Sequence, residues 1–299
     1  MTVLMHDAVA NLVPAAAEAY KAGRLYDLLY ADDTLILGTN AQDIGQFAAV
    51  IERMGANYGM SLHWGKTQAL PILSTDRILQ PDGTPMTEVS AMKYLGAVMD
   101  GHGRSDSEIS RKLGCAKGDF RELSKLWSHS AVTTKDKLKY FHSMVVAKLL
   151  YGLSSMWLVT AQRRRLDGFY ARCLRRILRI PCAYVSRISN AIVFARAGVR
   201  PFSDQLVGRQ LQLLGKVAHS PDESRERRDT FIPGTLQPQI GRYVRRVGRP
   251  RQDWTNQLLR IGCDRMGRET FGNMLADTSI GAQQSWIQEV KRVFVRCVA

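Results

Sequence analysis

The sequence predicts an α+β fold in which a small mixed part precedes a longer helical part. Two short apolar runs, residues 24–29 and 34–37, flank four residues that favour a tight turn, which predicts a β-hairpin. Apolar residues between positions 44 and 54 recur with the spacing of an amphipathic helix. After Gly103 helical periodicity dominates, so we expect strands only in the first third of the chain.

Length and composition are those of a globular protein with about two domains, since 45% of the 299 residues are hydrophobic and 23% are charged. No apolar run reaches the length of about 18 residues that a membrane span requires, so no membrane partner is expected. The first 13 residues lack the pattern of a secretory signal. Five widely spaced cysteines without a CxxC pair favour a reducing, intracellular compartment over a disulfide framework or a zinc site.

The net charge of +15 is unevenly distributed along the chain. Lys and Arg minus Asp and Glu give 6 − 11 = −5 for residues 1–100, 20 − 6 = +14 for 101–200 and 16 − 10 = +6 for 201–299. An acidic part attracts metal ions, and a basic part attracts the phosphate backbone of nucleic acid. The alternative is that the positive charge only keeps a helical domain in solution; the asymmetry favours nucleic acid.

In the first hundred residues we expect a helix over 3–20, ended or kinked by Pro14, and a hairpin that begins after Gly23. The amphipathic helix follows, and Gly59 is its predicted stop. One face of that helix is apolar: Ile44, Phe47, Ala48, Ile51 and Met54. Further short strands are predicted at residues 60–62, 68–72 and 93–99.

Beyond Gly103 the pattern predicts helices around residues 105–128, 133–159 and 163–179. The third has an apolar face made of Leu166, Phe169, Tyr170, Cys173, Leu174 and Ile177. Its arginines fall largely on the other side: Arg164, Arg165, Arg172, Arg175, Arg176 and Arg179. Such a row is typical either of a solvated basic face or of a surface that binds phosphates, and both interpretations stay open.

Three more helices are expected in the remaining chain. One begins at Ser203 as its N-cap and runs to about His219, one contains Trp254, and one places Trp286, Val290 and Phe294 on a single face. The arginine-rich residues 242–251 predict either a loop that contacts phosphates or a plain exposed linker.

The turn Tyr30-Ala31-Asp32-Asp33 is the strongest candidate for a site of chemistry. Two adjacent carboxylates on a tight turn favour a hard cation such as Mg²⁺, which takes oxygen ligands from one or two carboxylates and from substrate phosphates. In polymerases such ions clamp the oxygens of an in-line displacement. The alternative is structural, because Asp is common in turns for its local geometry.

Further motifs follow this turn in a fixed order. They are Gly59–Thr67 (GMSLHWGKT), Lys93–Gly96 (KYLG), Leu149–Gly152 (LLYG) and Cys173–Leu178 (CLRRIL). Together they resemble the C-terminal half of reverse transcriptases of non-LTR, LINE-type retrotransposons, over roughly residues 1–180. A weaker match follows at Gly248–Arg251 with Trp254.

The resemblance implies a partial polymerase palm over residues 1–103, with hairpin, amphipathic helix and short strands. An all-α, basic thumb is implied over 104–181 and a helical C-terminal extension over 182–299. The implied partners are an RNA template, a DNA primer and deoxynucleoside triphosphates, in the nucleus or cytoplasm. The oligomeric state is left open.

The resemblance also implies residue roles. Asp32 and Asp33 match the metal-binding aspartates of the palm, with Mg²⁺ as cofactor, and Tyr30 and Ala31 lie beside the primer end and the incoming nucleotide. Lys66 is expected either to sit near the triphosphate and protonate the leaving group or simply to face solvent. The four residues of the implied primer grip, a hairpin that holds the primer's 3′ end, are Lys93, Tyr94, Leu95 and Gly96.

The sequence departs from the family in ways that put its activity in doubt. The family has a further palm aspartate and a Gln-Gly segment before the hairpin; here Asp7, Glu18 and Asp27 are the acidic alternatives, and none has the matching context. In the next palm motif Met60 and His63 replace the usual Leu and Asn. In the family, the further palm aspartate and the fingers lie before the segment that this sequence matches. We therefore expect a truncated RNA-directed DNA polymerase that is inactive alone, because the matching segment lacks both.

Two alternatives from other functional classes remain. The chain is a nucleic-acid-binding module that acts without catalysis through its basic helices, or it is a retrotransposon relic with no selected role. Salt-dependent binding of nucleic acid favours the first, and failure to unfold cooperatively favours the second.

Overall fold

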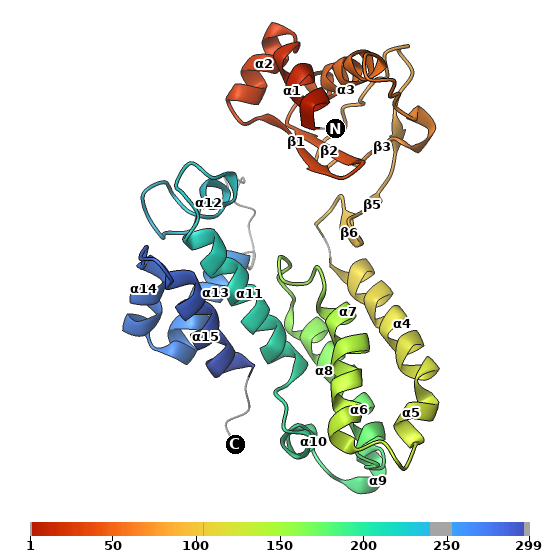
Figure 1. Cartoon of the computed structure of the whole chain (residues 1–299), viewed down its shortest axis with the longest axis vertical. Helices are drawn as coiled ribbons and strands as arrows, with labels where there is room; N and C mark the ends of the chain where they lie inside the picture. The colour runs from red at the N-terminus through yellow and green to blue at the C-terminus, as the bar shows by residue number, and fades with distance from the viewer. Residues whose placement is uncertain (1, 104, 240–252, 296–299) are drawn as a thin grey trace. The chain divides into compact units, whose positions relative to one another are not determined.

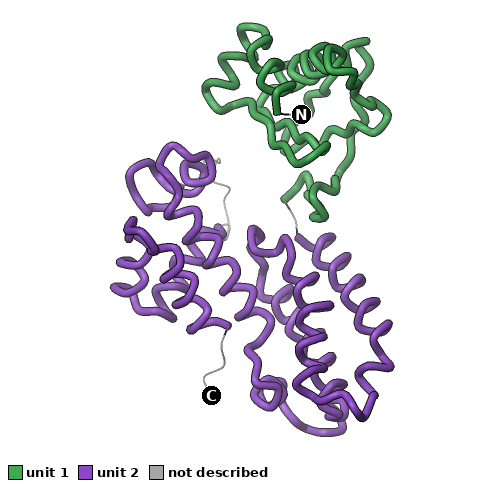
Figure 2. The backbone as a smooth tube through the Cα atoms, viewed as in Figure 1, with its two compact units in different colours: residues 1–104 green, residues 105–299 purple. Residues whose placement is uncertain are grey.

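The computed structural model describes residues 2–103, 105–239 and 253–295. It divides the chain into two compact units, Met1–Arg104 and Ser105–Ala299 (Figure 2). The first combines helices with small sheets and the second is helical, so the fold is mixed α and β. Each unit has apolar clusters of its own.

Unit 1 opens with α1 (Thr2–Ala10) and α2 (Pro14–Lys21). Pro14 begins the second helix rather than kinking a single one, because a proline in the first turn sacrifices no helical hydrogen bond. The strands β1 (Leu25–Tyr30) and β2 (Asp33–Gly38) pair antiparallel. Next comes α3 (Ala41–Ala56), whose predicted apolar face packs with α1, α2 and β1 (Figure 1).

The rest of unit 1 has less strand than the sequence predicts. Residues 60–62 are not a strand, because the backbone N–H of Met60 donates to Gly55 O at 2.9 Å and turns the chain back over the end of α3. After the 3₁₀ turn Trp64–Lys66, β3 (Gln68–Ala69) pairs in parallel with β4 (Thr87–Glu88).

The continuous strand predicted over residues 93–99 is wrong. The segment is a hairpin of β5 (Ala91–Tyr94) and β6 (Ala97–Asp100). Leu95 and Gly96 both have positive φ, 46° and 79°, as a tight two-residue hairpin turn requires. The alternation of apolar residues over 93–99 does not reveal that the chain reverses at Leu95 and Gly96.

Unit 2 is built from helices (Figure 1). In chain order they are α4 (Asp106–Glu122), α5 (Ser124–Ser128), α6 (Thr134–Phe141), the π-helix η2 (His142–Val146), α7 (Ala147–Leu150), α8 (Thr160–Ile177), α9 (Ala183–Ser186), α10 (Asn190–Ala197), α11 (Phe202–Ala218), α12 (Arg225–Thr230), α13 (Trp254–Met266), α14 (Arg268–Ala276) and α15 (Ala282–Phe294). The helix predicted over 133–159 ends at Leu150, where turns including Gly152 (φ 71°) follow.

Two large apolar clusters lie in unit 2. The first contains the predicted apolar face of α8, all of which is buried, and the second contains the predicted face of α15. Helix α11 belongs to both, with Leu206 in the first cluster and Val207 in the second. The apolar packing therefore changes from one cluster to the other within α11.

Ser203 does not cap α11 with its own side chain as the sequence predicts. Its N–H and hydroxyl both donate to the carboxylate of Asp167 on α8, each at 2.8 Å. A carboxylate from another helix thus satisfies a donor in the first turn of α11, where negative charge is also favoured.

Within the described ranges, no helix has both the length and the apolar character needed to cross a membrane. The cysteines of those ranges, Cys115, Cys173, Cys182 and Cys263, are free. Burial raises the pKa of the Cys173 thiol to about 12, so this side chain acts as a core residue and not as a nucleophile.

Candidate functional site

The hairpin of β1 and β2 presents both predicted metal ligands at its exposed tip. Tyr30 pairs with Asp33, so Ala31 and Asp32 form a two-residue turn. Ala31 has φ 53°, in the left-handed region that a non-glycine residue adopts at a cost of roughly 1 kcal/mol or more. Asp32 and Asp33 are exposed, and Tyr30 is 63% exposed. The hairpin therefore offers two adjacent carboxylates and an aromatic ring to solvent.

The other acidic candidates of unit 1 take structural partners. Tyr20 donates its hydroxyl to Asp27 Oδ1 at 2.9 Å, and burial, followed by this carboxylate, raises the pKa of Tyr20 to about 12. Tyr58 likewise donates its hydroxyl to Asp7 Oδ2. Asp27 thus joins β1 to α2, and Asp7 joins α1 to the turn that follows α3.

The second hairpin contacts the first. The Tyr94 hydroxyl donates to Leu28 O on β1 at 3.3 Å. Burial raises the pKa of the Tyr94 phenol, and the charge of the nearby Asp33 raises it further, so the ring lies within the field of that carboxylate. The turn Leu95-Gly96 follows directly, and Lys93 is exposed. The structure thus brings Tyr94 against β1, the strand that leads to the Asp-Asp turn, although the two lie far apart in the sequence.

Lys66 is not brought into this group. It ends the turn Trp64–Lys66 and is exposed. Trp64 fixes that turn by donating its indole N–H to Glu52 Oε1 on α3 at 2.7 Å. Within the described part of unit 1 no hydrogen bond or ion pair joins Lys66 to Asp32 or Asp33, which agrees with the solvent-facing alternative.

The two carboxylates of the turn do not form a complete metal site by themselves. Nowhere in the described residues do three or more His, Cys, Asp or Glu side chains come close enough to hold a metal ion. Two adjacent carboxylate oxygen donors suit Mg²⁺, which is commonly bound by one or two carboxylates together with substrate phosphates. The arrangement fits a site that substrate completes, and not a preformed metal cage.

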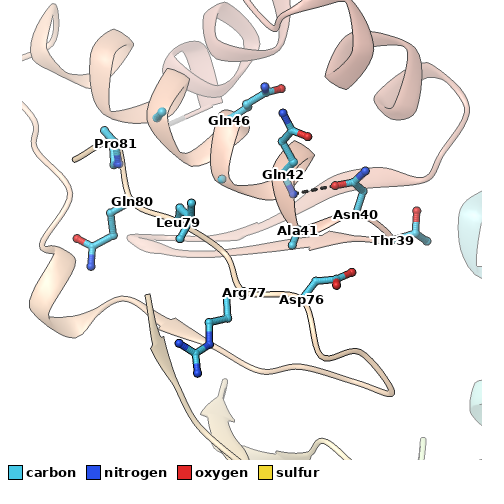
Figure 3. Close-up of a pocket in the computed structure, with 12 residues that line it drawn as sticks. Thr39, Asn40, Ala41, Gln42, Gln46, Asp76, Arg77, Leu79, Gln80 and Pro81 are labelled. Carbon is cyan, nitrogen blue, oxygen red and sulfur yellow. Dashed lines mark hydrogen bonds between the residues drawn. The ribbon is translucent and has the colours of Figure 1, made fainter. Parts of the chain in front are cut away.

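An open cavity of about 700 Å³ lies elsewhere in unit 1, between the start of α3 and the segment 76–81 (Figure 3). Asn40, Gln42, Arg77 and Gln80 are among its lining residues. None of the predicted site residues lines it, so the cavity and the Asp-Asp turn are separate features.

The six arginines predicted to face away from the apolar side of α8 divide into two kinds. Five are exposed, as predicted: Arg164, Arg165, Arg172, Arg176 and Arg179. Arg165 also donates from Nη1 to Ser110 Oγ on α4 at 3.1 Å. They give α8 and its C-terminal end a row of cationic side chains accessible to phosphates.

The expectation that Arg175 belongs to this exposed row is wrong. Only 5% of its surface is exposed. Helical periodicity places it opposite the apolar face, but the chain beyond α8 folds back over it. Its guanidinium donates to Pro181 O, Ser186 Oγ, Ile188 O and Asn190 Oδ1, at distances between 2.6 and 3.3 Å.

Two pairs of an arginine and an aromatic ring in this unit were not predicted from the sequence. Arg163 lies over the ring of Trp157, with Cζ 4.2 Å from the ring centroid. Tyr184 is 80% exposed and is contacted by Arg187. An aromatic residue inside a basic stretch is the signal that could have identified either pair.

Comparison with known proteins gives no match. No protein-family model matches the chain, and neither a curated protein nor a solved structure is similar to it. The arginine-rich residues 242–251, with the weaker motif match at 248–251, lie outside the described residues.

Proposed function

We propose that residues 1–181 are the part of a non-LTR-type reverse transcriptase that contains the metal-binding hairpin, the primer grip and the thumb. The observation that supports this most is the contact between the two hairpins. The strand β1, which leads to the turn with the two exposed aspartates, accepts a hydrogen bond from Tyr94 of a second tight hairpin, and a centre that holds both a metal and a primer end requires two such elements side by side.

In this function Asp32 and Asp33 hold Mg²⁺ together with the phosphates of a nucleotide. The bound ion supplies charge that stabilises phosphoryl transfer. Tyr30 and Ala31 position the nucleotide and primer end, and Lys93–Gly96 hold the primer strand. Because the described residues give the ion only this pair of carboxylates, we expect the chain by itself to extend primers very slowly or not at all.

Manganese binding tests the carboxylate pair directly. Mn²⁺ in the presence of a deoxynucleoside triphosphate, followed by electron paramagnetic resonance, should bind the unmodified chain. The Asp32→Asn, Asp33→Asn double variant should weaken Mn²⁺ binding by more than about tenfold. Even substitution of residues that only hydrogen-bond to metal ligands causes a loss of this size. Asp76→Asn, an exposed carboxylate outside the hairpin, is the matched control. Equal Mn²⁺ affinity in all three proteins would contradict the proposal.

Primer extension on an RNA template, with Mg²⁺ or Mn²⁺, tests the expected inactivity. The whole chain should give no more product than Asp32→Asn does. Extension clearly above that variant would show that the carboxylate pair is sufficient for catalysis, and the expectation of inactivity would be wrong.

A second function, nucleic-acid binding without catalysis, is favoured by the exposed arginines of α8. Binding through phosphates releases counterions, so affinity falls steeply with salt. Filter binding of the whole chain across a salt series should show this, and Arg172→Gln or Arg176→Gln should each lower the salt slope by about 1. Binding that does not respond to salt excludes this function.

A further inference from the structure

A stretch free of acidic residues follows the middle of α8. Between Asp167 and Asp204 the chain contains no Asp or Glu. The same stretch contains seven arginines: Arg172, Arg175, Arg176, Arg179, Arg187, Arg196 and Arg200. Any ligand at the surface of this stretch therefore meets local positive charge that no carboxylate of the same stretch offsets, and a polyanion is the ligand of complementary charge.

One of these arginines fixes the shape of the segment that follows α8. Arg175 is buried, and its four hydrogen-bond acceptors all belong to residues 181–190, here called the 181–190 loop. A buried guanidinium is unfavourable unless its donors are satisfied, and here the loop wraps around it to satisfy them. The loop is thus held in one conformation by a group at its base.

The anchored loop carries apolar side chains on its outside. Its short helix α9 exposes 80% of Tyr184 and 66% of Val185. Arg187 lies beside Tyr184, with Cζ 5.2 Å from the ring centroid. Its φ of 54° turns the backbone immediately after α9. Because so much of its surface is accessible, the Tyr184 ring can stack against a planar group, while Arg187 supplies positive charge next to it.

We propose that the 181–190 loop is a stacking site for an unpaired base of single-stranded nucleic acid. Tyr184 stacks on the base, and Arg187 with the exposed arginines at the end of α8 contacts the phosphates. The anchored conformation suits this use, since a tyrosine held in place loses little conformational entropy on binding. The inference rests on the nucleic-acid-binding function proposed for unit 2 and adds a site beyond the arginine row.

The test compares two fluorescein-labelled strands of about 10 nucleotides, within the range that single-strand binding sites span. One is oligothymidylate, and the other is an abasic strand of the same length and charge. Fluorescence anisotropy measures the affinity of the whole chain for each, without metal or nucleotide. Tyr184→Ala should lower the affinity for oligothymidylate about 5- to 150-fold and leave the affinity for the abasic strand unchanged. Tyr184→Phe should keep the affinity for both, because the ring remains.

Tyr140→Ala is the matched control. Tyr140 is 48% exposed on α6 of the same unit, so its loss should leave both affinities unchanged. If Tyr184→Ala leaves both affinities unchanged, or lowers the affinities for the two strands equally, the proposed stacking site is wrong. Phosphate binding by unit 2 would still stand. If the unmodified chain binds neither strand, the nucleic-acid-binding function and the stacking site both fail.

Discussion

Arg175 shows how one side chain can have a different role from its neighbours in the same row. Arg176, the next residue, is exposed, whereas Arg175 joins α8 to the chain that follows through four hydrogen bonds. The sequence places both on the polar side of α8. The two arginines differ in burial because the chain that follows α8 packs over Arg175 and not over Arg176. Helical periodicity cannot predict this, since it does not report which later segment covers a helix face.

Substituting each of these arginines by lysine separates the two roles. A lysine at position 175 has one nitrogen and cannot reach the acceptors of both Nη1 and Nη2, so some are left buried and unpaired. Arg175→Lys should lower the free energy of unfolding by about 1–3 kcal/mol. Arg176→Lys should change it by no more than about 0.5 kcal/mol. Urea unfolding of both variants measures this, and equal stability would argue against the anchor.

Among the elements, α11 and α15 make a close approach at a glycine. A Cβ on Gly215 would lie 2.1 Å from Nε1 of Trp286, which donates to Leu211 O at 2.9 Å from the buried side of α15. The absence of a side chain at Gly215 therefore leaves the space that the Trp286 indole occupies. Glycine is retained there although it is less favourable than alanine within a helix by about 1 kcal/mol.

Glycine-to-alanine changes should consequently have opposite signs at two helical positions. Gly215→Ala should destabilise the protein by about 1–3 kcal/mol, because the methyl group displaces Trp286 from a closely packed core. Gly168→Ala on α8 should stabilise it by up to about 1 kcal/mol, because no atom lies within 4 Å of the added carbon. Thermal unfolding compares the two variants, and a stabilised Gly215→Ala would show that the indole can move freely.

The elements that the sequence predicted best are those with long, regular apolar faces. The faces of α3, α8 and α15 are placed correctly because burial along a helix repeats with a fixed period. The apolar pattern did not show the turn at Leu95-Gly96, which only the family resemblance implied, and the contact of Asp167 with the start of α11 was not predicted at all. The first depends on one turn and the second on contact between residues 36 apart, and neither leaves a periodic trace. In the candidate site the Asp-Asp turn was predictable, whereas the hydrogen bond from Tyr94 to Leu28 O on β1 is a tertiary contact.

For the whole molecule, the two units with separate apolar clusters should lose structure independently. Phe47 is fully buried in a cluster formed entirely by residues of unit 1. Phe47→Ala should destabilise unit 1 by about 3–5 kcal/mol through the lost burial and the cavity left behind. Hydrogen exchange followed by mass spectrometry should then be faster within residues 2–103 and unchanged in 105–239 and 253–295. Faster exchange throughout would mean that the units fold as one.

Because α11 contributes to both apolar clusters of unit 2, it limits where the chain can be divided when a segment is grafted onto another protein. A graft that ends at residue 181 would keep Tyr170 but remove Phe202, whose ring centroid lies 6.1 Å from that of the tyrosine, together with Leu206. The first core would then expose apolar side chains that α11 normally covers. A transplantable segment should therefore extend through α11, and it must also bring α15 or a substitute for the apolar side chains that α15 supplies to the second core.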